Sequence, residues 1–486
     1  MVETHENFIA GAWLAGHDTI ENRNPSDLND LIGQYAQASA NQVDQALEAA
    51  RQAQFKWATY GLERKQNVLN SIGIEMMDRA EELGTLLSRE EGKPLAEGKG
   101  EVYRAGQFFT YYAAEVLRQI GDTADSVREG IEIDVRRAPV GVVGIISPWN
   151  FPMATASWKI APALAFGNSV IWKPANLTPA SAVALTEIIA RQDIPKGLFN
   201  LAMGPGGTVG QHLIESPHLD AISFTGSVPV GKAIATTAIA NLTKVQMEMG
   251  RKNALAVMDD ADLDLAVSLA LSGAFGSTGQ KCTASSRLVV HATVHDAFVE
   301  KLVTGAQAMT VGHALATGTQ IGPVVSQKQL EENLAYVALG QSEGAALVCG
   351  GDRLVRKTDG YFMAPGIFVG STNAMRINRE EMFAPLAAVI KVDSYDEALH
   401  VVNDTQFGLT SGIVTQSLSR ATHFRRNART GCVMVNLATA GTDYHVPFGG
   451  CGDSSYGPRE QGSYAAEFYT TVKTAYIASG IPGSAA

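Results

Sequence analysis

The stretch VGVVGIISPWNFPMATASWKIAPALAFGNSVIWK, residues 140–173, decides the fold of this chain. Its first eight residues form an almost continuous apolar run, which is typical of a strand buried on both faces of a sheet. Residues 154–166 follow a helical pattern, and residues 169–173 form a second apolar strand. A strand, a helix and a strand at this spacing predict a parallel βαβ unit.

The same alternation continues downstream of this unit. We expect helices at 179–191 and after Gly207, and strands at 197–204, 221–227 and 244–250. The pattern therefore predicts an α/β fold with a doubly wound parallel sheet. Sheets of this kind bind ligands at the carboxyl ends of their strands.

The flanking regions predict further elements. Residues 43–59 and 62–90 have helical periodicity, and the strand and helix alternation of residues 251–430 predicts a second α/β unit. Residues 121–138 suggest a half-exposed hairpin, and residues 467–477 alternate like an exposed strand. A long exposed edge invites aggregation unless another chain covers it, so we interpret these two segments as an oligomerisation element. The alternative is a strand paired within the chain.

Composition excludes several classes of protein. The formal charge of −11 argues against nucleic acid and anionic membranes as partners. The sequence has no apolar run of 18 residues, and its N-terminus lacks the basic region of a signal peptide. The four cysteines are far apart without a CxxC pair, so we expect neither disulfides nor a zinc site, and we expect a cytoplasmic location.

Three polar residues are candidates for chemistry. Cys282 lies among small and polar residues in FGSTGQKCTASSR, where Lys281 would favour the reactive thiolate. Glu248 ends a predicted strand, and Asn150 lies in the turn ISPWNFP after another strand. Each has a plainer interpretation: a small core cysteine, a surface carboxylate and a turn-forming asparagine.

Two glycine-rich turns follow predicted strands. The turn GPGGTVG, residues 204–210, fails the dinucleotide fingerprint because Val209 stands where a glycine is needed. FTGS, residues 224–227, is a second turn of small residues. Both lie where a helix N-terminus could bind phosphate. The scattered histidines indicate no metal site.

Taken together, these motifs resemble the aldehyde dehydrogenase family over nearly the whole chain. The order PWNFP, KPAN, FTGS, EMG, GQKC, EEMFAP and PFGG follows the order and spacing of the family's motifs. The resemblance implies a Rossmann-like NAD(P)-binding domain of residues 1–120 and 139–250, and a catalytic domain of residues 251–455. It also implies a β-hairpin oligomerisation arm, residues 121–138 and 456–486, and a homodimer or homotetramer.

The resemblance also implies roles for single residues. Cys282 matches the nucleophile, Asn150 and the Cys282 N–H match the oxyanion hole, and Glu248 matches the base that activates water. The positions that match the family's contacts to NAD or NADP are Trp149, Lys173, Asn176, Gly206, Gly226, Ser227, Met249, Glu381 and Phe383.

The chain departs from the family's pattern at several positions. Asn176 replaces a frequent glutamate that repels the 2′-phosphate, so we expect NADP to be accepted along with NAD. Arg251 replaces a glycine, and it could narrow the cofactor site or point outward. Ala384 and Gly452 stand where glycine and lysine are usual. These changes bear on cofactor affinity and rate more than on the class of reaction.

Other segments of the sequence indicate which aldehyde is the substrate. Trp158 stands where succinate semialdehyde dehydrogenases commonly carry a carboxylate-binding arginine, which argues against that substrate. The C-terminal segment resembles the branch of the family that oxidises α-ketoglutarate semialdehyde (2,5-dioxopentanoate). An aromatic or other semialdehyde is the alternative, since Trp158 and Tyr444 could line an apolar pocket or simply be core aromatics. His445 is a candidate polar contact.

Two other functions share these motifs. A CoA-acylating dehydrogenase would use CoA in place of water, but such relatives usually lack the glutamate base that Glu248 provides. A binding protein without activity is supported only by the changes at Arg251, Ala384 and Gly452.

Overall fold

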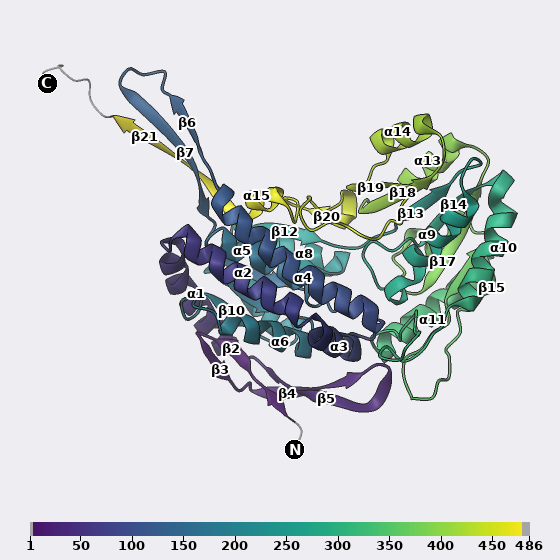
Figure 1. The fold of residues 1–486 in the computed structure, drawn as a ribbon, viewed down its shortest axis with the longest axis horizontal. Coiled ribbons are helices and arrows are strands. Elements are labelled where there is room, and N and C mark those ends of the chain that lie inside the picture. The colour runs from purple at the N-terminus through teal and green to yellow at the C-terminus, as the bar shows by residue number, and fades with distance from the viewer. Residues whose placement is uncertain (1–2, 479–486) are drawn as a thin grey trace, which may run out of the picture.

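Figure 1 shows a computed structural model of the chain, which describes residues 3–478. The predicted α/β class is confirmed. The first large sheet is mostly parallel and has the order β20 (Ser455–Tyr456), β12 (Lys244–Glu248), β11 (Ala221–Thr225), β8 (Val142–Ile146), β9 (Ser169–Lys173), β10 (Phe199–Leu201), β2 (Asn7–Ile9), β3 (Ala12–Leu14). Its strands β8 to β12 run in the same direction, so their carboxyl ends share one edge.

The second large sheet forms the other lobe of the molecule (Figure 1). Its order is β15 (Ala346–Cys349), β16 (Gly366–Val369), β17 (Leu386–Val392), β14 (Arg287–His291), β13 (Ala254–Val257), β18 (Thr410–Val414), β19 (Cys432–Val435), and all neighbours except β15 and β16 are parallel. A small third sheet near the N-terminus is formed by β1 (Thr4–His5), β5 (Asp27–Gln37) and β4 (Asp18–Asn24).

Helices cover both faces of the two large sheets. They are α1 (Ala40–Ala58), α2 (Leu62–Asp78), α3 (Ala80–Glu91), α4 (Leu95–Glu115), α5 (Ala154–Ala165), α6 (Pro179–Ala190), α7 (Gln211–Glu215), α8 (Val228–Ala240), α9 (Leu263–Phe275), α10 (Ala292–Ala308), α11 (Gln327–Ser342), α12 (Arg376–Arg379), α13 (Tyr395–Asn403), α14 (Leu418–Asn427) and α15 (Ala466–Tyr469). On β8, Val143 packs into the core under α4 and α5, whereas Val142 packs into the core under α1 and α8. This two-sided burial explains why the run at 140–147 does not alternate. The predicted helical stretch 62–90 is two helices, because Arg79 leaves helical geometry between α2 and α3.

A three-stranded arm projects from the first lobe (Figure 1). Its order is β21 (Thr470–Ala478), β7 (Ile131–Pro139), β6 (Asp122–Asp125). Strand β21 thus pairs within the chain, as the alternative interpretation held, yet its outer edge has no partner strand among residues 3–478. The predicted arm began at residue 456, but Phe468 and Tyr469 are buried in the main core, so the projecting part begins at Thr470. Residues 479–486 of that predicted segment lie outside the described part of the chain. Within the described part, no helix is both long and apolar enough to cross a membrane.

Candidate active site

Cys282 lies where three cavities meet. The loop that carries it precedes β14, at the amino end of the second sheet, and faces the carboxyl edge of the first sheet. The inter-sheet cavity, of about 210 Å³, has a wall made by Trp149, Gly226, Ser227, Met249, Glu381 and Phe383. The α4 cavity, of about 250 Å³, lies beside α4, and the Glu248 cavity, of about 20 Å³, leads to that carboxylate. Among the described residues only Cys282 lines all three.

The loop before Cys282 has an unusual backbone. Ser277 and Thr278 have left-handed φ values of 49° and 56°, which are uncommon outside glycine and cluster at functional sites. Gly279 follows with a φ of 67°, and a Cβ there would lie 2.0 Å from the carbonyl oxygen of Ala384. The glycine is therefore required both by its φ and by this close approach.

Side chains from distant segments hold the carbonyl groups of this loop. Asn253 donates to the Cys282 oxygen at 2.9 Å, and Thr439 donates to the Thr283 oxygen at 2.7 Å. Arg251 donates to the Gly279 oxygen at 2.7 Å. These bonds fix the loop that carries Cys282, which is the preorganisation that catalysis at this cysteine would need.

Arg251 neither narrows the cofactor site nor points outward, the two possibilities that the sequence left open. Its side chain is 1% exposed and lies beneath the Cys282 loop. Burial raises the pKa of the Cys282 thiol to about 12, and the Arg251 guanidinium opposes that rise. Arg251 thus supplies a charge that favours the thiolate, a role the sequence had assigned to Lys281 alone. The Lys281 amino group, which donates to the Ser272 oxygen, also interacts favourably with the thiolate, because burial lowers the pKa of Lys281 and Cys282 opposes that change.

Asn150 is held by hydrogen bonds to its side-chain amide and to its backbone oxygen. It follows β8, and its side-chain amide donates to the Gln280 oxygen at 2.9 Å. The fully buried Lys93 donates to the Asn150 oxygen at 2.6 Å. Glu101 pairs with Lys93 at 2.6 Å and accepts the N–H of Met153 at 3.0 Å. The predicted oxyanion donor is therefore fixed next to the nucleophile loop by α3 and α4.

Glu248 ends β12 and is 4% exposed. Burial raises the pKa of this carboxyl well above its usual range, and the nearby Glu460 raises it further. Ser455 donates to one carboxylate oxygen at 2.7 Å. The Glu248 cavity also touches Cys282, and its volume of about 20 Å³ is enough for one water molecule.

The inter-sheet cavity brings most of the predicted cofactor residues together. Trp149 and Phe383 meet edge to face with ring centroids 5.5 Å apart. Glu381 accepts the N–H of Arg251 at 3.2 Å, and burial raises the pKa of its carboxyl. Gly226 and Ser227, from the turn after β11, also line this cavity.

Three predicted cofactor residues, Lys173, Asn176 and Gly206, lie outside this cavity but on the same sheet edge. Lys173 ends β9, Asn176 is half-buried in the following loop, and Gly206 lies in the turn after β10. Burial lowers the pKa of Lys173 to about 8. Nothing lies within 4 Å of a Cβ placed at Gly206, so the backbone there is open to a ligand.

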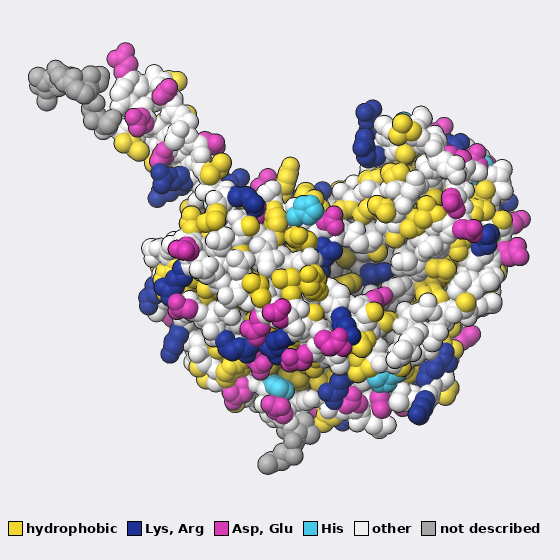
Figure 2. All heavy atoms as spheres, in the orientation of Figure 1, with side chains coloured by type: hydrophobic (Ala, Val, Ile, Leu, Met, Phe, Trp, Pro, Cys, Tyr) yellow, Lys and Arg dark blue, Asp and Glu magenta, His cyan; other side chains and the backbone are white. Residues whose placement is uncertain are grey.

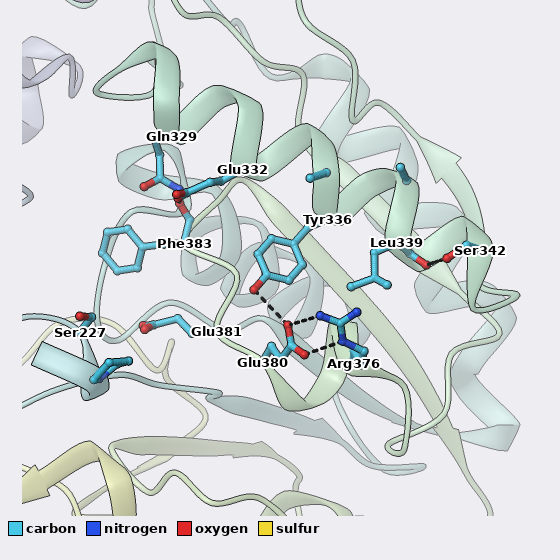
Figure 3. A pocket seen from close by; sticks show the side chains of 13 residues that line it. Ser227, Gln329, Glu332, Tyr336, Leu339, Ser342, Arg376, Glu380, Glu381 and Phe383 are labelled. Carbon is cyan, nitrogen blue, oxygen red and sulfur yellow. Dashed lines mark hydrogen bonds and ion pairs between the residues drawn. The ribbon is translucent and has the colours of Figure 1, made fainter. Parts of the chain in front are cut away.

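A wider groove, of about 1010 Å³, continues from Glu381 and Phe383 along α11 (Figure 3). At its far end Arg376 pairs with Glu380 at 2.6 Å, and the Tyr336 hydroxyl donates to Glu380 at 3.3 Å (Figure 3). Glu380 belongs to the motif EEMFAP, whereas Tyr336 and Arg376 come from segments without a recognisable motif, so this end of the groove was not predicted.

The two predicted substrate residues take different positions. Trp158 lines the α4 cavity and the Glu248 cavity. Tyr444 is not among the residues that line the α4 cavity. Its ring packs against Phe108, with the ring centroids 6.4 Å apart, and His445 packs against the Tyr444 ring. The α4 cavity also contains Arg104, which the sequence analysis missed.

Comparisons with known proteins identify a family that the chain resembles over nearly its whole length. Residues 13–475 match the model of the aldehyde dehydrogenase family. The chain is 41% identical to the alpha-ketoglutaric semialdehyde dehydrogenase of Bacillus subtilis, over 98% of each chain. It is 37% identical to the alpha-ketoglutarate semialdehyde dehydrogenase of Haloferax volcanii, over 98% of this chain and 99% of that protein.

Solved structures show the same fold. The structure of betaine aldehyde dehydrogenase from Staphylococcus aureus in complex with NAD+ superposes with a TM-score of 0.96 at 30% identity. The match covers 98% of this chain and 95% of that one. The likeness therefore extends over both lobes and the arm.

Proposed function

Because this chain belongs to the aldehyde dehydrogenase family, and so oxidises aldehydes with NAD(P), we propose that Cys282, Asn150 and Glu248 carry out the reaction. The observation that carries this assignment is the position of Cys282 at the junction of three cavities. One cavity would admit the aldehyde, one would admit the nicotinamide end of the cofactor, and one would hold the hydrolytic water.

In the first half-reaction the Cys282 thiol releases its proton to solvent, and the thiolate adds to the aldehyde carbon to form the thiohemiacetal as its alkoxide. The carbonyl oxygen gains negative charge in this step, and the Asn150 amide and the Cys282 N–H are placed to stabilise it. Losing one such donor typically lowers turnover by a factor on the order of 10² to 10³. Covalent catalysis of this kind divides one difficult step into two easier ones.

The residues around the inter-sheet cavity fit NAD(P). Trp149 and Phe383 present aromatic surface for a nicotinamide ring, and the Glu381 carboxylate can accept hydrogen bonds from ribose hydroxyls. Lys173 and Asn176, further along the sheet edge, suit the adenosine ribose. When bound, the cofactor supplies the hydride acceptor that turns the thiohemiacetal into a thioester.

In the second half-reaction Glu248 takes a proton from a water molecule, whose oxygen attacks the thioester carbon. The carbon–sulfur bond breaks, the acid leaves, and the proton held by Glu248 passes to the departing Cys282 thiolate. A buried carboxyl with a raised pKa suits this work, because it is a stronger base than an exposed one. Glu248 also favours this reaction over the CoA-acylating alternative, which needs no water-activating base.

We propose α-ketoglutarate semialdehyde as the substrate. The support is the likeness to two relatives named for that aldehyde, together with Trp158 in place of the arginine of succinate semialdehyde dehydrogenases. An aromatic or other semialdehyde remains the second candidate, because Trp158, Phe108 and Phe448 line the α4 cavity. Asn176 in place of a glutamate supports the use of NADP as well as NAD.

We further propose that the protein is a cytoplasmic homodimer or homotetramer. The unpaired outer edge of β21 suits pairing with a second copy of the chain. A nucleophilic thiol must stay reduced, and the cytoplasm keeps thiols in that state.

Two variants test the catalytic assignment. We expect Cys282→Ala to abolish NAD(P)H formation, and Glu248→Gln to keep a burst of NAD(P)H but to stall afterwards, when both are followed by stopped-flow absorbance. Cys451→Ala is the matched control, because this exposed thiol lies outside the three cavities. Full steady-state turnover in either test variant would refute the assignment.

A substrate panel tests the rest of the proposal. We expect the highest kcat/KM with α-ketoglutarate semialdehyde among semialdehydes and aromatic aldehydes, with measurable rates for both NAD and NADP. A higher kcat/KM for an aromatic aldehyde would favour the second candidate. A requirement for added CoA would favour the acylating reaction.

A further inference from the structure

One face of helix α4 forms a wall of the α4 cavity. The residues it contributes are Glu97, Gly100, Glu101, Arg104 and Phe108. Their spacing of three to four residues places them on a single helical face, so this wall runs for several turns away from Cys282. Side chains at the far end can therefore contact the end of a substrate that is remote from its aldehyde group.

Both carboxylates on this face are already engaged by protein groups. Glu101 pairs with the buried Lys93 at 2.6 Å. Glu97 accepts the N–H of Ser277 at 3.1 Å and also binds the Ser277 hydroxyl. Neither carboxylate is an ion-pair partner of Arg104, although all three line the same cavity.

Arg104, on the same wall, carries a positive charge that no carboxylate of the described residues pairs with. Within residues 3–478 its guanidinium has no carboxylate within 4 Å and no side-chain hydrogen bond. Its Cζ atom lies 5.2 Å above the centre of the Tyr444 ring, a cation–π arrangement that fixes the side chain and leaves its donors free. A half-buried guanidinium with free donors suits a carboxylate, which it can bind through two parallel bonds.

Two further polar groups of this cavity lack partners. Gln461 is 1% exposed, and among the described residues its Oε1 atom has no hydrogen-bond partner. The Trp158 indole N–H is likewise buried without an acceptor among them. An unpaired buried polar group destabilises the protein, so both groups would gain by binding a polar ligand atom. A rotation of the Gln461 amide presents either its carbonyl or its NH₂ group to that atom.

We infer that the α4 cavity selects an aldehyde that also carries a carboxylate and an internal oxo group. Arg104 binds the carboxylate, and the Gln461 amide and Trp158 N–H bind the oxo oxygen. This inference rests on the proposed function and deepens it, because it assigns the residues that recognise a keto acid. A neutral aliphatic aldehyde would leave all three groups unpaired.

Four aldehydes separate these contributions. Pentanal and glutarate semialdehyde differ by the carboxylate, and glutarate semialdehyde and α-ketoglutarate semialdehyde differ by the oxo group. Succinate semialdehyde tests chain length. We would measure kcat and KM separately for the wild type, Arg104→Met, Arg104→Lys and Gln461→Leu. Arg118→Met is the matched control, because Arg118 pairs with Glu115 near the end of α4, away from the cavity.

We expect Arg104→Met to lower kcat/KM for the five-carbon acidic aldehydes roughly 10- to 100-fold, mainly through KM, and to leave pentanal unchanged. Arg104→Lys should recover part of the loss. Gln461→Leu should lower kcat/KM for α-ketoglutarate semialdehyde roughly 3- to 10-fold and leave glutarate semialdehyde unchanged. Arg118→Met should behave as the wild type.

Two results would overturn the inference: an equal loss on pentanal and on the acids in Arg104→Met, or no loss on any acid. Thermal unfolding of each variant shows whether a general loss comes from misfolding, and Arg104→Lys then provides the decisive comparison. If the wild type prefers another aldehyde, the proposed substrate fails. The role of Arg104 is still decided by its effect on acidic relative to neutral aldehydes.

Discussion

Arg251 is a buried cation next to the loop that carries the proposed nucleophile, Cys282. The side chain donates to the oxygens of Gly279 and Ala284, and it is fully buried beneath Cys282. A buried cation is costly unless it is paired or hydrogen-bonded, and these carbonyl groups provide such bonds. Arg251 therefore acts as a positioning residue that also places a positive charge near the thiol.

We predict that Arg251→Met moves the reactivity of Cys282 to higher pH. Arg251 holds the thiol pKa down against burial, so its loss raises that pKa and reduces the thiolate fraction at neutral pH. We expect alkylation of Cys282 by iodoacetamide at pH 7.5 to slow by on the order of tenfold, which corresponds to one pKa unit. Mass mapping of the Cys282 peptide measures this rate, with Cys451 as the internal control. Arg251→Lys should recover much of the rate, and an unchanged profile in Arg251→Met would contradict the prediction.

Lys173 gives a second prediction about pH. Burial lowers its pKa to about 8, so the amino group is charged below that pH and neutral above it. If Lys173 contacts the adenosine ribose, NADP affinity should fall as the pH rises past about 8, by roughly tenfold between pH 7 and 9.5. NADPH fluorescence titrations measure this change, and NAD should show a smaller one. Lys173→Met should have lower affinity and a flatter pH dependence. The same pH dependence of NADP affinity in the wild type and in Lys173→Met would show that a group other than Lys173 titrates.

At the scale of elements, buried ion pairs connect the first helices to the catalytic turn. Lys93, between α3 and α4, is paired with Glu101 and donates to the Asn150 oxygen. Glu91 lies 3.9 Å from Lys93, and burial raises the pKa of Glu91 to about 8. The position of Asn150 therefore depends on helices that are remote in sequence.

We predict that Lys93→Met lowers the free energy of unfolding by about 3–5 kcal/mol, because it leaves Glu101 buried without its counter-charge. Chemical denaturation measures the loss. The double variant Lys93→Met, Glu101→Gln removes both charges and should recover much of the stability. Its turnover should remain low, because Asn150 still lacks the contact from Lys93. Turnover that recovers together with stability would contradict this positioning role.

The sequence allowed elements to be predicted better than the cavities between them. The strands at 142–146 and 169–173 were predictable because two-sided burial leaves an unbroken apolar run. Cys282, Glu248 and Asn150 could be proposed because each lies in a recognisable motif at a strand or loop boundary. Arg104 and Gln461 carry no such signal, since α4 is amphipathic like many helices and its partners are remote in sequence. The periodic Glu97, Glu101 and Arg104 were the one available clue.

At the scale of the whole molecule, the two large sheets present opposite ends to each other. The first contributes the carboxyl ends of its strands, with Asn150 and Glu248, and the second contributes the loop before β14, with Cys282. Neither lobe holds the complete set of residues. We therefore expect the reaction to depend on the relative position of the lobes, and the arm that projects from the first lobe lies outside this arrangement (Figure 1).

The outer edge of β21 in this arm has no partner strand among residues 3–478. Strand β21 pairs with β7 along nine residues, and Figure 2 shows apolar side chains on the projecting arm. Val472 and Tyr476, which share a face of β21, are 64% and 61% exposed. Exposed apolar side chains beside an unpaired strand edge favour association, so we expect Val472→Glu with Tyr476→Glu to shift the protein toward the 51.5 kDa monomer in sedimentation velocity. Leu418→Glu, at an exposed leucine of α14, is the control and should keep the wild-type mass.

Alkylation of Cys282 should persist in the double variant, because the arm lies outside the three cavities. An unchanged mass would show that the oligomer, if one forms, uses another surface.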